Sequence, residues 1–252
     1  MPRTISLRLA AACALVVALS LMSVSVAAAK GFSADLRVVG KGGKILAEKT
    51  VTTGAISVKT SPKATCFGPG TGGSGDSVAL KENNALALLA RGAKSTPALN
   101  PLLISDSFDF GLALCGVGSG VAKGGLSWYL KVNHKGTMVS ADTTKIKAGD
   151  EVLFALAESD PKTFAYPEEL ALVVPAKAQA GKAFTVTAYS YDEKGKRKPA
   201  AGVKVTGASG LTSATGNATV TLSGPKRLLA TKGDLIPDRA AVCVGGKCPA
   251  GS

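Results

Sequence analysis

Residues 183–191 read AFTVTAYSY, and this stretch gives the clearest strand signal in the chain. β-Branched and aromatic residues dominate it, and the side chains of a strand point alternately to its two faces. We therefore expect the apolar residues of one face to lie between two sheets. Further short runs of this kind, separated by Gly, Pro or Asp, lie at residues 170–174, 203–206, 218–222, 227–231 and 240–244. Such spacing is typical of a small all-β sandwich.

The first half of the chain combines strand patterns with one short helix. Residues 35–39 and 45–51 flank a glycine-rich connection, which predicts a hairpin. Asn84 precedes the good helix formers ALALLAR and Gly92 follows them, so we expect a helix of about two turns between an Asn cap and a Gly stop. More strands are expected at residues 102–105, 127–132 and 151–157. This order of elements indicates an α+β domain.

Two prolines mark the change between these halves. Pro161 and Pro167 flank a short segment, and the residue before a proline is disfavoured in a helix, so the pair indicates a domain boundary. We expect a first domain over residues 30–160, a second over residues 167–245 and a C-terminal tail over residues 246–252.

The composition limits the chemistry that the chain can perform. Of its 252 residues, 46% are apolar, which is enough for a hydrophobic core. The chain has one histidine, which excludes active sites that need several imidazoles as bases or metal ligands. We expect no enzyme activity, no bound metal and no cofactor. One enzymatic alternative stays open, a hydrolase carboxylate pair drawn from Asp106, Asp109, Asp142 and Asp150.

The first 29 residues predict a cleaved secretory signal peptide. Arg3 and Arg8 give a positive start, residues 9–26 are apolar, and small residues precede Lys30. We expect cleavage between Ala29 and Lys30, secretion to the extracellular space and no membrane span in the mature chain. An uncleaved membrane anchor is the alternative interpretation of the same segment.

Cleavage would leave four of the five cysteines. An even number of cysteines in an oxidising compartment predicts disulfides, and four cysteines allow three connectivities. We favour Cys66 with Cys115, which lie in one expected domain, and Cys243 with Cys248, which would close a short loop. A four-Cys zinc site is the less favoured alternative, because it needs two close pairs and the sequence has one.

The chain is basic, with a formal net charge of +13. The excess of basic over acidic residues is 4 over residues 30–160 and 7 over residues 161–252. The densest basic run, KGKRK at residues 194–198, is expected to form a solvated hairpin tip. An anionic polymer of the cell surface is a possible partner by Coulomb attraction. Nucleic acid is not expected, because the chain is exported and no aromatic residues interleave with these lysines.

Three segments of the first half carry a family pattern: SWYLKVNH at residues 127–134, SAD at 140–142 and KAGDEV at 147–152. They resemble the transcobalamin C-terminal-like domain family, whose signature reads W-x-Y-x-V-N-G, then G-A-D, then G-D before the final strand. His134 and Ser140 depart from it, since each stands where the family often has Gly. The resemblance covers about residues 32–160 and implies a β-grasp, ubiquitin-like fold.

Four segments of the second half each place a turn glycine near a strand: residues 180–186, 199–205, 215–220 and 229–232. They resemble bacterial immunoglobulin-like modules of the invasin or carboxypeptidase-regulatory kind, over about residues 168–244. Such modules imply a spacer or a binding surface on a secreted or envelope protein, without catalysis. The expected fold is thus mainly β, a β-grasp domain followed by an all-β immunoglobulin-like sandwich.

The first resemblance also implies a ligand. In the vitamin carriers of that family, this β domain covers one face of a cobalamin, while a helical barrel absent from this sequence supplies much of the pocket. The implied ligand contacts are Trp128, Tyr129, Asn133 and His134. Trp128 can also be interpreted as a residue of the core. Asn133 and His134 can also be interpreted as a turn at the end of a strand.

Two functional hypotheses stand beside the hydrolase alternative. The leading one is a secreted, non-enzymatic two-module protein that binds or adheres to an unknown component of the cell envelope, another protein or a carbohydrate. The alternative is a small-ligand binding protein of the corrinoid type.

Overall fold

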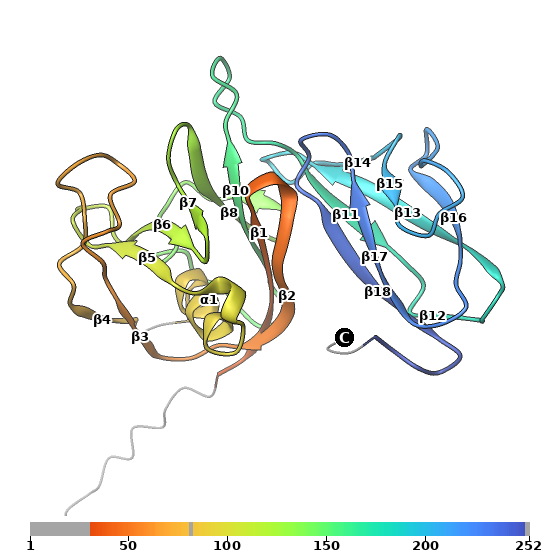
Figure 1. Ribbon diagram of the computed structural model, residues 1–252, viewed down its shortest axis with the longest axis horizontal. Helices are drawn as coiled ribbons and strands as arrows, with labels where there is room; N and C mark the ends of the chain where they lie inside the picture. The colour runs from red at the N-terminus through yellow and green to blue at the C-terminus, as the bar shows by residue number, and fades with distance from the viewer. Residues whose placement is uncertain (1–30, 81–82, 250–252) are drawn as a thin grey trace, which may run out of the picture. The chain divides into compact units, whose positions relative to one another are not determined.

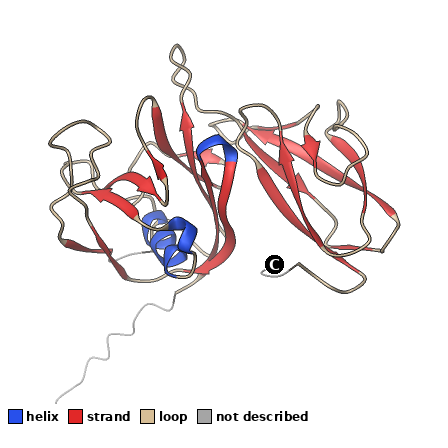
Figure 2. Cartoon of the chain, viewed as in Figure 1, coloured by secondary structure: helices blue, strands red, loops and turns tan. Residues whose placement is uncertain are grey.

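The computed structural model describes residues 31–80 and 83–249. The expected signal peptide, its cleavage site at Ala29 and Lys30, and the last residues of the expected tail lie outside this part. Figures 1 and 2 show that the described residues fold mainly into strands with one α-helix, which confirms the mainly β prediction. No helix in the described ranges is long and apolar enough to cross a membrane.

The first sheet is built around a parallel pair of strands, β1 (Ser33–Gly40) and β10 (Glu151–Glu158). Its other neighbours are antiparallel: β2 (Lys44–Thr52), β8 (Leu126–Val132) and β9 (Lys135–Gly136). The order across the sheet is β2-β1-β10-β8-β9. The 3-10 turn η1 (Lys41–Gly43) joins β1 to β2, and Gly42 adopts a φ of 68° there, which glycine reaches without strain.

The helix α1 (Ala85–Lys94) packs against this sheet through a shared apolar core (Figure 1). Asn84 caps it as predicted, because its Oδ1 accepts a hydrogen bond from the Ala87 N–H at 2.8 Å. The predicted Gly stop is wrong, since Gly92 lies inside the helix. A Cβ at that position would lie 2.5 Å from Cδ2 of Leu36, so this glycine permits close packing of helix on sheet.

Two smaller sheets complete this N-terminal region, defined here as residues 31–160. One pairs β3 (Ile56–Lys59) with β4 (Ser77–Leu80), and the other contains β5 (Leu102–Ser105), β6 (Ala113–Val117) and β7 (Gly120–Val121). The 3-10 turn η2 (Pro97–Leu99) lies between α1 and β5. Of these strands the sequence predicts only β5, because the others are short segments among Gly- and Ser-rich turns.

The C-terminal region, residues 167–249, consists of two sheets. In the first, β13 (Ala183–Tyr191) pairs on one edge with β11 (Glu169–Val173) and on the other with β14 (Arg197–Pro199) and β16 (Asn217–Thr221). The second has the order β12 (Lys177–Ala178), β18 (Asp238–Val244), β17 (Lys226–Thr231) and β15 (Lys204–Val205). Side chains from both sheets form one buried cluster that includes Val186 and Ala188, as the alternation in residues 183–191 predicts.

Only part of the basic run at residues 194–198 forms the predicted hairpin tip. Residues 192–196 make the turn, where the Asp192 Oδ1 accepts hydrogen bonds from the N–H groups of Lys194 and Lys196. Arg197 and Lys198 instead belong to β14, because they pair with the end of β13. The Arg197 guanidinium lies 4.5 Å from the centre of the Tyr189 ring, and this cation–π contact holds it on the strand.

The two regions share contacts. Val39, Tyr129, Leu153 and Ala155 of the N-terminal region form a buried cluster with Ile236 of the C-terminal region. Both regions belong to one compact unit, residues 31–252. The domain boundaries expected from the sequence stay a prediction.

Candidate functional site

A groove lies beside the edge of β8. Its volume is about 820 Å³, within the range of small-molecule sites in proteins. Residues 126–130 of β8 line it, together with the segment 135–141 that follows this strand. Further walls come from the start of β6, the loop before it, and residues 163–166. β9 pairs only with the last two residues of β8, so backbone groups of Trp128 and the Leu130 N–H are left open to the groove.

Large apolar side chains gather at this groove. Eight such side chains are exposed in the described part of the chain, and five of them line the groove: Phe67, Phe110, Met138, Val139 and Phe164. Met138 is 99% exposed and Phe67 is 64% exposed. Single apolar residues on a surface need no explanation, but a contiguous group of them marks an interaction site.

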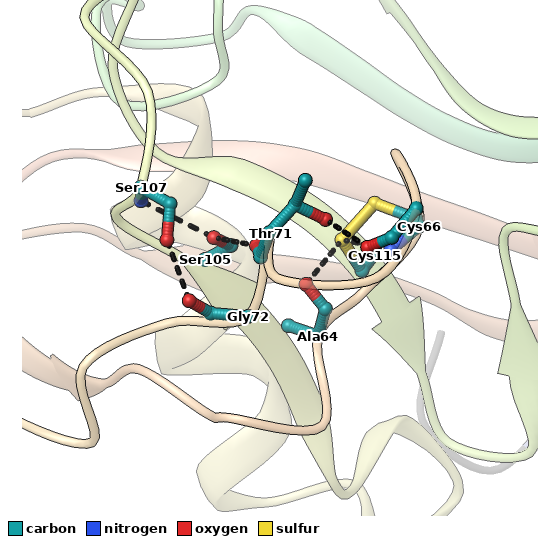
Figure 3. Close-up of a disulfide and its surroundings, with 8 residues drawn as sticks. Ala64, Cys66, Thr71, Gly72, Ser105, Ser107 and Cys115 are labelled. Atoms are coloured by element: carbon teal, nitrogen blue, oxygen red, sulfur yellow. Dashed lines mark hydrogen bonds between the residues drawn. A yellow bond between two sulfur atoms is a disulfide. The ribbon is translucent and has the colours of Figure 1, made fainter.

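The disulfide between Cys66 and Cys115 fixes one wall of the groove. Figure 3 shows how this predicted bridge ties the loop that carries Cys66 to strand β6. The same loop is held again further along, because Ser105 Oγ donates a hydrogen bond to the Thr71 carbonyl at 2.6 Å. The second predicted bridge, between Cys243 and Cys248, also forms and lies away from the groove lining.

Phe67 follows Cys66 directly, so the bridge also positions its ring. That ring meets Phe108 edge to face with centroids 5.0 Å apart, and Phe108 stacks on Phe110 at 4.8 Å. Such aromatic pairs add about 0.5–1.5 kcal/mol beyond the area they bury. The exposed rings are therefore held in a fixed arrangement.

Trp128 and Tyr129, which line the groove, each carry a buried polar atom without a partner in the described part of the chain. Tyr129 stacks on Tyr166 with ring centroids 4.1 Å apart, while Trp128 packs against the core that α1 shares with the first sheet. The Trp128 Nε1 and the Tyr129 hydroxyl are buried, and neither has a hydrogen-bond partner among the described residues. Burial raises the pKa of Tyr129, so its hydroxyl keeps its proton and stays a donor. Because buried polar groups are nearly always paired, two such donors indicate a place for acceptors.

One end of the groove is positive. Lys135 and Lys194 both line it, and a bridge between their backbones makes them neighbours. Glu193 lines the same end, but its Oε1 already accepts a hydrogen bond from the Tyr166 N–H at 3.0 Å. Two lysines thus face one carboxylate, which leaves an excess of one positive charge at this end. A ligand with an acidic group would be favoured at this end.

The structure separates the four predicted ligand contacts. Trp128 and Tyr129 line the groove. Asn133 and His134 instead form the two-residue turn between β8 and β9, with φ values of 49° and 68°. Asn133 stabilises this turn, because its Oδ1 accepts a hydrogen bond from the Glu151 N–H at 2.9 Å. This turn is the alternative interpretation given above for both residues.

A cluster of buried charges lies where the two regions meet. The Arg37 guanidinium is at its centre and contacts Glu151 at 2.9 Å, Glu169 at 2.6 Å and Asp238 at 2.6 Å. The Lys131 Nζ lies 2.8 Å from the second oxygen of Glu169. The side chains of Arg37, Lys131 and Glu169 are almost completely buried. Two carboxylates of the C-terminal region are therefore neutralised by cations of the N-terminal region.

Part of this cluster has the geometry of a metal site. Ligand atoms of His134, Glu151 and Glu169 lie within 4.8 Å of one another, and His134 Nδ1 is 2.7 Å from Glu169. However, Arg37 and Lys131 already pair with these carboxylates. A divalent cation would have to bind beside two positive side chains, which Coulomb repulsion opposes. We therefore interpret the cluster as an ion-pair network.

The acidic residues considered for a hydrolase have other contacts. Asp106, Asp142 and Asp150 accept backbone N–H groups of Ser74, Leu112 and Lys147 respectively. Each of these three carboxylates thus stabilises a different turn. The fourth residue, Asp109, lies in the loop before β6.

We expect acid to destabilise the protein through Glu169. Burial raises the pKa of this carboxyl, but the hydrogen bond from His134 and the charges of Arg37 and Lys131 outweigh burial and lower its pKa to about 2. The unfolded chain, with a pKa of 4.5, therefore binds a proton in this interval that the folded chain does not. The stabilisation is complete above pH 4.5 and is lost as the pH falls toward 2.

Urea unfolding of the wild type and of Glu169→Gln across this acidic range measures the effect. The free energy of unfolding of the wild type should fall more steeply with acid than that of the variant. Two parallel curves would show that Glu169 does not titrate as expected.

The exposed side chains of the groove were not predicted from the sequence. Phe67, Phe110 and Phe164 lie in loops, and Met138 and Val139 follow the end of β9. A signal does exist for Phe67 and Phe110, because each precedes a glycine in a segment without a strand or helix pattern, and such loops run over the surface. No pattern in the sequence shows, however, that loops so far apart in the chain converge on one strand.

Compared with models of protein families, with curated proteins and with solved structures, the chain has no match.

Proposed function

We propose that this protein is a secreted, non-enzymatic binding protein whose binding site is the groove beside β8. The observation that carries the proposal is the meeting of five exposed apolar side chains with the unpartnered donors of Trp128 and Tyr129. An apolar surface with a few directed polar groups is the usual construction of a ligand site. The groove would take an apolar or amphipathic ligand that carries hydrogen-bond acceptors.

Two features support a location at the cell envelope. The two disulfides fit an oxidising compartment outside the cytosol, where such bonds persist. The chain without its expected signal peptide has a formal net charge of +11, which would attract it to anionic surface polymers.

We also propose the family assignment that the sequence resemblances imply. The parallel pair β1 and β10 with α1 across the sheet supports a β-grasp domain in the N-terminal region. Two sheets of short strands around a common core support an immunoglobulin-like sandwich in the C-terminal region. A corrinoid is then the second candidate ligand, favoured by the position of Trp128 in the groove.

Binding of anilinonaphthalene sulfonate tests the proposed site. This aromatic anion becomes fluorescent in apolar surroundings and matches both the apolar walls and the positive end of the groove. We expect Phe67→Ser to weaken its binding about tenfold or more, because burying a large apolar side chain contributes about 1.5–3 kcal/mol.

Leu211→Ser is the matched control, because Leu211 is 63% exposed, as Phe67 is at 64%, but does not line the groove. Equal affinity of the two variants, or no binding by the wild type, would contradict the proposed site. Addition of cobalamin tests the second candidate, since Trp128 is the only tryptophan of the chain and its fluorescence should then be quenched. Unchanged fluorescence after correction for absorption would remove the corrinoid.

A further inference from the structure

We propose that the ligand of this groove is an extended peptide segment with an acidic end, which adds a strand to the open edge of β8. This inference rests on the proposed function and names the class of partner. It follows from three properties of the groove: free backbone groups, side-chain sites on both faces of one strand, and charge.

The backbone of β8 offers hydrogen bonds toward the groove. The Leu130 carbonyl accepts from the Thr137 N–H at 3.1 Å, on the side away from β10. The Asn133 N–H points the other way and donates to Glu151, the first residue of β10. Because residues two apart on a strand direct their backbone groups to the same side, the N–H and C=O of Trp128 also face away from β10.

The Leu130 carbonyl is paired with Thr137, but other backbone groups on this side of β8 have no backbone partner in the described part of the chain. β8 pairs only with β10 and, through its last two residues, with β9. The Leu130 N–H and both backbone groups of Trp128 therefore remain unpaired at the groove. An apolar small molecule could not satisfy this row of alternating donors and acceptors, whereas another extended chain could.

The side chains around this edge fit a strand. Trp128 packs with the core on one face of the sheet, and Tyr129 stacks on Tyr166 on the other face. Both residues line the groove, so the groove reaches both faces of the edge. Side chains of an added strand would point alternately to these faces. The exposed Phe67, Phe110 and Phe164 would then cover its apolar residues.

The positive charge at one end of the groove is the reason for proposing an acidic end on the peptide. Lys135 and Lys194 lie next to each other at the end of the groove where β9 begins. The Glu193 carboxylate beside them is engaged by the Tyr166 N–H. An aspartate, a glutamate or a C-terminal carboxylate of the peptide would meet both lysines.

The proposal can be tested by selecting binders from a displayed library of random peptides of about ten residues. The affinities of the selected peptides are then measured with synthetic copies. We expect binders with alternating apolar residues and an acidic end. Replacing a peptide N–H by N-methyl should weaken binding about tenfold at every second position and little in between, because only alternate N–H groups face β8. Lys135→Glu with Lys194→Glu should weaken binding in low salt, whereas Leu211→Ser should not change it.

Three outcomes separate this proposal from the proposed function. Alternation of the N-methyl effect, together with loss of binding in Phe67→Ser, supports strand addition. If no selected peptide depends on Phe67 while anilinonaphthalene sulfonate does, the groove is a binding site and the peptide proposal is wrong. If neither ligand depends on Phe67, both proposals fail.

Discussion

Replacing Arg37 with methionine is expected to destabilise the protein by about 3–5 kcal/mol, the largest effect of any single substitution considered for this chain. Methionine keeps much of the apolar volume of the side chain but leaves Glu169 and Asp238 without the guanidinium at 2.6 Å from each. Glu169 is almost completely buried, so its charge cannot be solvated by water instead. Lys131 still pairs with Glu169, but Asp238 loses its only ion-pair partner among the described residues, so the cost is that of a largely buried carboxylate without a cation.

Urea unfolding at neutral pH measures this cost. Arg239→Met is the matched control, because Arg239 pairs with Glu48 at 3.0 Å but its side chain is 31% exposed. The control should cost at most about 1 kcal/mol. Adding Asp238→Asn to Arg37→Met should restore part of the lost stability, since Asp238 has no other ion-pair partner among the described residues, whereas Glu169 keeps its lysine partner. Equal losses for the two arginine variants would contradict the role assigned to Arg37.

Removing the Cys66–Cys115 disulfide is the second change with a large expected effect. The bridge joins residues 49 apart, and the chain-entropy model gives about 4 kcal/mol for a loop of that length. The double variant Cys66→Ala, Cys115→Ala should therefore unfold at a much lower urea concentration. Binding at the groove should also weaken, because Phe67 loses the anchor beside it.

The other disulfide provides the control. Cys243 and Cys248 are 5 residues apart, and the same model gives about 2 kcal/mol for that loop. Cys243→Ala with Cys248→Ala should leave binding at the groove unchanged, because this bridge does not line it. A loss of stability as large as that of the first pair, or weaker binding, would contradict the assignment of the groove wall to Cys66 and Cys115.

The sequence predicts those parts of the fold that local patterns determine. The alternation in residues 183–191 predicts β13, and Asn84 predicts the start of α1. Both disulfide pairings were favoured from their positions in the chain. Gly92 shows the limit of such reasoning. A glycine after helix formers usually ends a helix, whereas here it lies inside the helix and leaves room for the Leu36 side chain.

The candidate site is predicted less completely. A family resemblance selects Trp128 and Tyr129, which line the groove, but also selects Asn133 and His134, which form a turn. The ion pairs of Arg37 join residues up to 201 positions apart, and no local pattern encodes such contacts. The exposed phenylalanines converge only once the disulfide and the sheets are formed.

NMR of the Trp128 indole tests most directly whether the groove beside β8 is the binding site. The chain has a single tryptophan, so it shows one indole N–H resonance, and this Nε1 is buried without a partner in the free protein. Saturation with anilinonaphthalene sulfonate or with a selected peptide should shift this resonance and slow its exchange with water. An unchanged indole resonance in the saturated protein would show that binding occurs elsewhere.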